Sequence, residues 1–160
     1  MRMRNMLAVG AIVVMTFVTP SVMAGEKTGA WLNMEGCAIC EPLMAEKGLM
    51  EHIHWGEHAF ATGLVMTCSV DPGQEQAYGR AGAKMQQAIE RYMKGEAMKV
   101  CGQCASMKEL AMAGAKIEEV QAAGAHLTIV SATDPKLIDR IHAHCERTNA
   151  EMAKMAKAEK

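Results

Sequence analysis

Two stretches of this chain share one pattern: MEGCAIC at residues 34–40 and MKVCGQC at residues 98–104. Both read M-x-x-C-x-x-C, so each places two cysteine sulfurs and one methionine sulfur close together in the chain. Soft sulfur donors of this kind favour Cu(I) or another soft metal ion. The same cysteines are also typical of a reversible disulfide, because a C-x-x-C thiol at a helix N-terminus has a lowered pKa.

The repeat extends beyond the cysteines. Cys101 follows Cys37 by 64 positions, and the Asp-Pro pair at residues 134–135 follows the pair at residues 71–72 by 63 positions. The apolar segments that precede these pairs, residues 63–70 and 126–133, align as well. Nearly constant spacing indicates one supersecondary unit used twice, and we predict repeats over about residues 31–94 and 95–158.

Each half reads as a helix, two strands and a second helix. Apolar residues at helical spacing predict helices from Cys40 to about Met50 and from Cys104 to about Gly114. Strands are predicted over residues 51–60, 63–70, 116–122 and 126–133. Each Asp-Pro pair is expected to start a long helix, with aspartate as the cap and proline in the first turn.

The predicted fold class is therefore α+β: two pseudo-symmetric α-β-β-α units, duplicated in tandem, form one four-stranded antiparallel sheet packed by helices. A half of this size buries too little surface to fold alone. A single fused domain is expected over residues 25–160.

The first 24 residues are typical of a secretory signal peptide. Arg2 and Arg4 precede an apolar run at residues 7–18, and Ala24 is small at the expected cleavage position. That run is too short to span a bilayer comfortably, so we expect no membrane segment after its removal. The expected location is periplasmic or secreted, where the 6 cysteines would meet an oxidising environment.

Composition and motifs exclude several classes of function. The formal charge is -1 and aromatic residues make up 4% of the chain, so a nucleic acid is not an expected partner. Neither C-x-x-C is followed by histidine, which argues against covalently attached haem. The chain also lacks a glycine-rich phosphate-binding loop and the H-E-x-x-H and G-x-S-x-G motifs of metalloproteases and serine hydrolases. Most of the 16 methionines are interpreted as core packing in a chain poor in aromatic residues.

Three interpretations of the motif cysteines stay open. Each pair forms a structural disulfide, or each pair is redox-active or binds a soft metal alone, or all four meet in one Cys₄ site, typically for zinc. The leading hypothesis is an exported protein that binds or hands over a soft metal, with Cu⁺ first and zinc second. The proposed ligands are Met34, Cys37, Cys40, Met44, Met98, Cys101 and Cys104. This hypothesis requires sulfurs that are accessible to solvent.

The rival from a different class is a thiol-disulfide oxidoreductase. In it, Cys37 and Cys101 would attack and Cys40 and Cys104 would resolve the mixed disulfide. A structural zinc or disulfide scaffold is a further alternative, and a binding protein is favoured over an enzyme. The partners implied are the metal ion and either a metal-donor or acceptor protein or a redox partner.

Two further cysteines and a pair of alternating histidines outside the two motifs also carry thiol or metal chemistry. Cys68 and Cys145 fall on predicted core faces, either as a disulfide or as two buried thiols. His52 and His54 alternate along a predicted strand, where they would chelate Zn²⁺ or Cu²⁺ or form a solvated polar face.

Overall fold

The computed structural model describes residues 30–122 and 124–158, so the predicted signal peptide lies outside the described residues. The elements are α1 (Glu41–Ala45), the 3₁₀-helix η1 (Leu49–His52), β1 (Ile53–Phe60), β2 (Gly63–Val70), α2 (Glu75–Met93), α3 (Gly102–Met112), β3 (Lys116–Ala122), β4 (Ala125–Ser131) and α4 (Pro135–Ala158). Helices packed on one antiparallel sheet confirm the α+β class.

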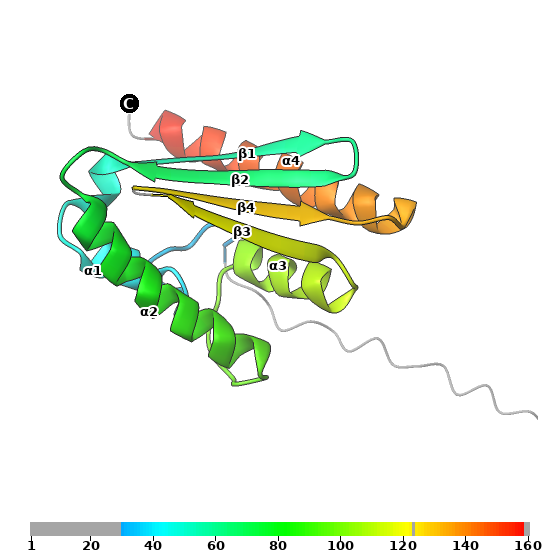
Figure 1. Cartoon of the computed structure of the whole chain (residues 1–160), viewed down its shortest axis with the longest axis horizontal. Helices are drawn as coiled ribbons and strands as arrows, with labels where there is room; N and C mark the ends of the chain where they lie inside the picture. Colours follow the sequence, from blue (N-terminus) through cyan, green and yellow to red (C-terminus); the bar gives the residue numbers. More distant parts are fainter. Residues whose placement is uncertain (1–29, 123, 159–160) are drawn as a thin grey trace, which may run out of the picture.

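The sheet has the strand order β1-β2-β4-β3, and every neighbouring pair is antiparallel (Figure 1). The two hairpins close alike, because Phe60 pairs with Gly63 and Ala122 pairs with Ala125, 62 positions later. At the centre, Met66 pairs with Thr128, which is also 62 positions later. An approximate twofold axis through the middle of the sheet would relate β1 to β3 and β2 to β4. Such an axis requires the equal offset of 62 positions at both hairpins and at the centre. The duplication of the sequence itself stays a prediction.

The helices cover one face of the sheet. Strand alternation places Leu64 of β2 and Val130 of β4 on this face, where both are buried and pair across the ladder. They pack against Leu110 of α3 and against Ile141 of α4, which runs behind the strands in Figure 1. On the opposite face Leu127 remains 38% exposed. The core therefore lies between the sheet and a single layer of helices.

The two Asp-Pro pairs behave differently. Pro135 is the first residue of α4, and the Asp134 carboxylate accepts a hydrogen bond from the Lys136 N–H at 2.9 Å, as predicted. The same prediction is wrong for α2, which begins three residues after Pro72. There, the Asp71 carboxylate is occupied by two histidine side chains, and residues 72–73 form a turn.

The first predicted helix is also shorter than expected. It ends at Ala45, and Gly48 then takes a φ of 76°, a left-handed conformation that interrupts a helix and favours glycine. The chain continues from there as η1 and enters β1. This early break leaves the first C-x-x-C in a compact loop rather than at the start of a long helix.

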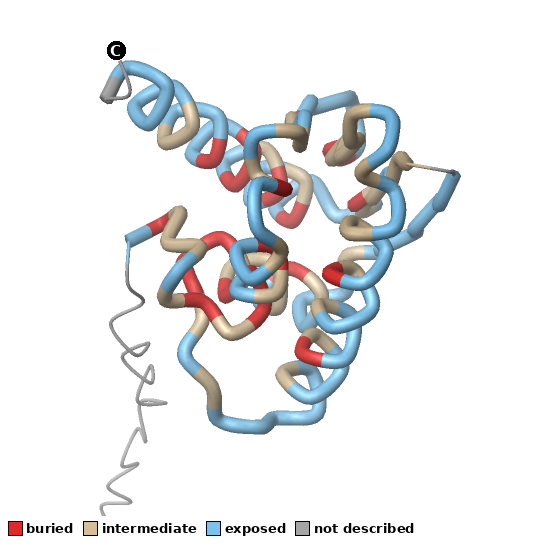
Figure 2. The backbone as a smooth tube through the Cα atoms, turned by 90° about the vertical axis from the view of Figure 1, so that its left-hand side faces the viewer, coloured by how far each residue is buried: buried red, intermediate tan, exposed pale blue. Residues whose placement is uncertain are grey.

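Figure 2 shows the buried segments gathered on the inner sides of the elements, while the C-terminal end of α4 is exposed. Strand β3 is exposed along its whole length because it forms one edge of the sheet. Within residues 30–122 and 124–158, no helix has the length and apolarity that crossing a bilayer requires.

Candidate metal centre

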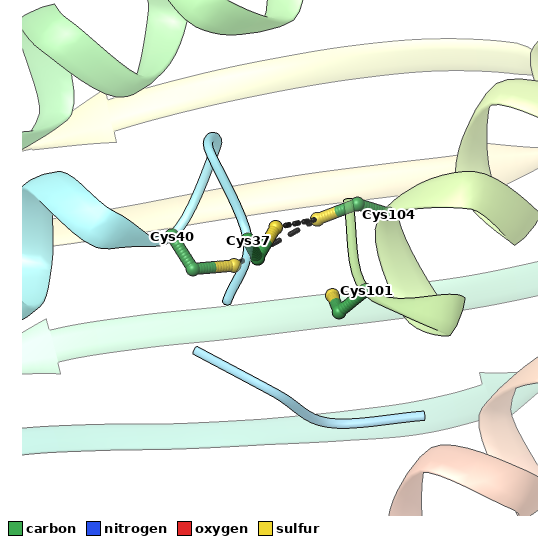
Figure 3. Close-up of side chains that lie close together, drawn as sticks. All are labelled: Cys37, Cys40, Cys101 and Cys104. Atoms are coloured by element: carbon green, nitrogen blue, oxygen red, sulfur yellow. Dashed lines mark hydrogen bonds between the residues drawn. The ribbon is translucent and has the colours of Figure 1, made fainter. Parts of the chain in front are cut away.

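The four motif cysteines come together in one cluster. Their sulfur atoms all lie within 4.8 Å of one another, although the two pairs are separated by 61 positions of sequence between Cys40 and Cys101 (Figure 3). The Sγ atom of Cys104 lies 3.7 Å from that of Cys37 and 3.8 Å from that of Cys40. All four are free thiols rather than disulfides.

The first pair is held by a tight turn that leads into α1. The N–H groups of Cys40 and Glu41 both donate to the carbonyl of Cys37, at 3.0 and 2.8 Å. Pro42 sits in the first turn of α1, where a proline ring fits and no donor is needed. The N–H of Ala38 donates to the carbonyl of Lys99 at 2.9 Å, which ties this loop to the segment before the second motif.

The second pair is positioned by the start of α3. Cys101 is the extended residue that precedes the helix, and Cys104 lies in its first turn. The N–H of Gln103 donates to the carbonyl of Trp31 at 3.0 Å, so the chain before the first motif covers the N-terminus of α3. Some of the N–H groups that a helix N-terminus leaves without a partner therefore donate hydrogen bonds to backbone carbonyls here.

The sulfur positions fit a tetrahedral ion. With a Zn–S bond of about 2.3 Å, the edge of an S₄ tetrahedron is about 3.8 Å. The two closest sulfur pairs, at 3.7 and 3.8 Å, match that edge. Four thiolates in this arrangement are typical of zinc or iron-sulfur coordination. The cluster is thus compatible with one ion bound between the two motifs.

The centre is closed to solvent on most sides. Cys37 and Cys101 are 1% and 2% exposed, Cys40 is 9% exposed, and only Cys104 is half-buried. The accessibility required for ready metal transfer is therefore absent at three of the four cysteines. A closed four-ligand arrangement is typical of ions that remain bound, because an open coordination position is missing.

The clustered thiols do not share protons equally. Hydrogen bonds with Cys101 and Cys104 hold the pKa of Cys37 far below the ordinary thiol range, and the hydrogen bond with Cys104 lowers the pKa of Cys101 to about 7. Hydrogen bonds with Cys101 raise the pKa of Cys40 and of Cys104, and burial raises both further. Within the metal-free cluster, the pKa thus falls for the first cysteine of each motif and rises for the second.

The three methionines proposed as ligands are placed differently. Met34 and Met98 pack against the apolar cluster that contains Cys37, Cys40 and Cys101. Met44, in α1, is 39% exposed and is not part of that cluster.

Cys68, Cys145, His52 and His54 are not members of the four-cysteine cluster. Cys68 and Cys145 are free thiols, and burial raises the pKa of each. The Asp71 carboxylate bonds to His54 Nε2 at 2.7 Å and to His52 Nδ1 at 3.0 Å. These hydrogen bonds, the one with His54 above all, lower the pKa of Asp71. The two histidines are thus partners of one carboxylate at the surface.

Sequence reasoning missed a buried polar network beside the centre. Glu57 of β1 and His144 of α4 are each 2% exposed. Gln103, inside the second C-x-x-C, donates from Nε2 to Glu57 Oε1 at 2.9 Å, and His144 Nε2 lies 3.7 Å from the same oxygen. Strand alternation with the inward residues Ile53 and Trp55 was the available signal for Glu57. Helical spacing was the available signal for His144, which follows the inward residue Ile141 by three positions.

Comparisons of this chain with models of known protein families, with curated proteins and with solved structures find no match. The functional argument therefore depends on the geometry of the four cysteines and of the residues around them.

Proposed function

We propose that this protein binds one soft metal ion per chain at the tetrathiolate centre and retains it. The observation that carries this proposal is the convergence of four free sulfurs within 4.8 Å from two distant motifs. Bringing four thiols together in a buried place is costly unless something compensates the crowding. A divalent ion does so, because it replaces the thiol protons and neutralises part of the thiolate charge.

Zn²⁺ is the ion we favour. It takes four thiolates in a tetrahedron, and the closest sulfur pairs already have the separation that this requires. It has no redox chemistry of its own, so it suits a centre that joins the loop before α1 to the start of α3. In this role the ion holds together the two halves of the chain.

Cu⁺ is the second candidate, and one observation favours it. Met34 and Met98 pack against the cysteine cluster, and thioether sulfur is a good ligand for Cu(I) but a poor one for zinc. If these methionines contribute, a Met34→Leu, Met98→Leu double variant should bind Cu⁺ more weakly while its affinity for Zn²⁺ is unchanged. The matched control is Met112→Leu, since Met112 is 71% exposed.

The oxidoreductase alternative has less support. Its attacking residues would be Cys37 and Cys101, and both sulfurs belong to residues that are almost fully buried. A thiol must be reachable by the substrate disulfide in order to attack it. We expect no reduction of insulin disulfides by the metal-free protein above the rate of free thiol, and clear turnover would favour catalysis over retention.

We further propose that the protein works in an exported compartment, on the strength of the signal-peptide pattern at residues 1–24. The ion must then be loaded before oxidation joins the cysteines as disulfides. The partner implied is a source of the ion, and the low exposure of the sulfurs favours slow exchange once the ion is bound.

The test is native mass spectrometry of protein purified without oxygen and titrated with Zn²⁺ or Cu⁺. One ion per chain is expected, and it should be lost in a Cys37→Ser, Cys101→Ser double variant. The control, Cys68→Ser with Cys145→Ser, should keep the ion, because neither residue belongs to the cluster. Binding of two ions per chain, or an equal loss in the control, would refute the single tetrathiolate centre.

A further inference from the structure

A second feature with binding character lies between α3 and α4, beside the second C-x-x-C: Gly102 belongs to its lining, but none of the four cysteines does. It is an open hollow of about 320 Å³. Its lining combines charged, polar and aromatic side chains, among them Trp31, Ser106, Glu109, Arg140, His144 and Arg147. Nothing in the proposed metal chemistry requires such a hollow, so its side chains need a separate explanation.

Two arginines in the hollow have no anionic partner among the residues that the structure describes. Of the four arginines in the described part of the chain, Arg80 and Arg91 pair with glutamates. For Arg140 and Arg147, no carboxylate oxygen of the described residues lies within 4.0 Å. A guanidinium offers five N–H donors in a plane that matches carboxylate and phosphate oxygens.

Arg147 is also held in a fixed place. Its guanidinium carbon lies 4.1 Å from the centre of the Trp31 ring, in a cation-π arrangement. A guanidinium stacked by its face keeps the N–H groups along its edge available for a ligand. Arg140 lies seven positions earlier on the same helix, about two turns away and therefore on the same side of α4. The two cations can act on one ligand.

The floor of the hollow is built from buried polar groups. Ser106 Oγ lies 2.9 Å from His144 Nδ1, and the His144 side chain is only 1% exposed. The other ring nitrogen, His144 Nε2, lies 3.7 Å from an oxygen of Glu57, a residue outside the lining of the hollow. The imidazole therefore holds the Ser106 side chain in place, and the Ser106 hydroxyl is the hydrogen-bonding group that this pair offers to the hollow.

We propose that this hollow binds a small anion that carries carboxylate or phosphate groups. Two unpaired guanidinium groups outweigh the single carboxylate of Glu109 in the lining, so the charge balance favours a negative ligand. Arg140 and Arg147 bind the anionic oxygens, and the Ser106 hydroxyl donates a further hydrogen bond from the floor. This inference goes beyond the metal centre and does not depend on it.

Isothermal titration calorimetry of the full chain, with and without Zn²⁺, tests this, with inorganic phosphate and succinate as separate probes. We expect saturable binding of one molecule per chain, with a Kd of about 1 mM or tighter. An Arg140→Gln, Arg147→Gln double variant should bind at least about tenfold more weakly, a loss of about 1.4 kcal/mol or more. Binding of only one probe supports the site and identifies the anionic group.

The matched control is Arg80→Gln, which removes an exposed arginine that already pairs with Glu46. It should leave anion binding unchanged, and circular dichroism should show that every variant is folded. Binding of neither probe would overturn the proposal. Unchanged binding in the double variant would overturn it as well. An equal weakening in the control would also do so, because that result would indicate a general effect of net charge.

Discussion

The proposed ion should contribute a large part of the stability of this fold, because its four ligands come together only in the folded chain. The four cysteines meet only in the folded chain, because 61 positions of sequence separate Cys40 from Cys101. An ion that binds the folded chain alone, at a free concentration of about 1,000 times its Kd, stabilises it by about 4 kcal/mol. The metal-loaded protein should exceed the metal-free protein in free energy of unfolding by about that amount.

The assay is urea denaturation, with the free ion held constant in one series and removed by a chelator in the other. The midpoint should fall in the chelator series, and the thermal midpoint should fall by roughly 10 to 16 °C for a folded chain of this length. A Cys101→Ser variant should resemble the chelated protein in both series. Cys68→Ser, outside the cluster, should respond to the ion as the unmodified protein does.

Two outcomes would refute this reasoning. The first is a metal-free protein as stable as the loaded one, within about 0.5 kcal/mol, since ion binding would then contribute nothing to the folded state. The second is a Cys101→Ser variant that the ion still stabilises fully, because this result would place the ion elsewhere in the chain.

Two further predictions concern the cluster and its surroundings. The raised pKa values of Cys40 and Cys104 keep both thiols protonated near neutral pH, so ion binding above pH 7 should release about two protons. The affinity for the ion should therefore rise about 100-fold per pH unit. A titration monitored at several pH values checks this, and an affinity independent of pH contradicts it. Gly102→Ala should destabilise the fold by about 1–3 kcal/mol in urea denaturation, because its new Cβ would lie 2.9 Å from the Trp31 ring. Gly82→Ala, on an open side of α2, should instead stabilise the fold by about 1 kcal/mol, and the reverse order would contradict the packing described here.

Much of the fold follows from local patterns in the sequence. The segments 63–70 and 116–122 alternate or extend as strands, and the structure forms β2 and β3 over the same residues. The helix that starts at Pro135 was also predictable, since aspartate and proline suit the cap and the first turn. These features depend on neighbours a few residues apart, and such neighbours can be seen in a single sequence.

Features that depend on distant residues could not be predicted in the same way. Asp71 does not cap α2 because His52 and His54, on the neighbouring β1 side, bind its carboxylate. Cys37 and Cys101 are buried in one cluster that includes Ala88 of α2, a residue outside both motifs. Tertiary contacts of this kind override local preference. The convergence of both motifs in one cluster was one of three interpretations, and only the spatial arrangement favours it.

The most direct test of the central claim is X-ray absorption spectroscopy of the protein loaded with one equivalent of Zn²⁺. Our account predicts a single shell of four sulfur ligands at about 2.3 Å from the ion. A shell with two sulfurs and lighter nitrogen or oxygen ligands would mean that the two motifs bind separately, and it would contradict the tetrathiolate centre.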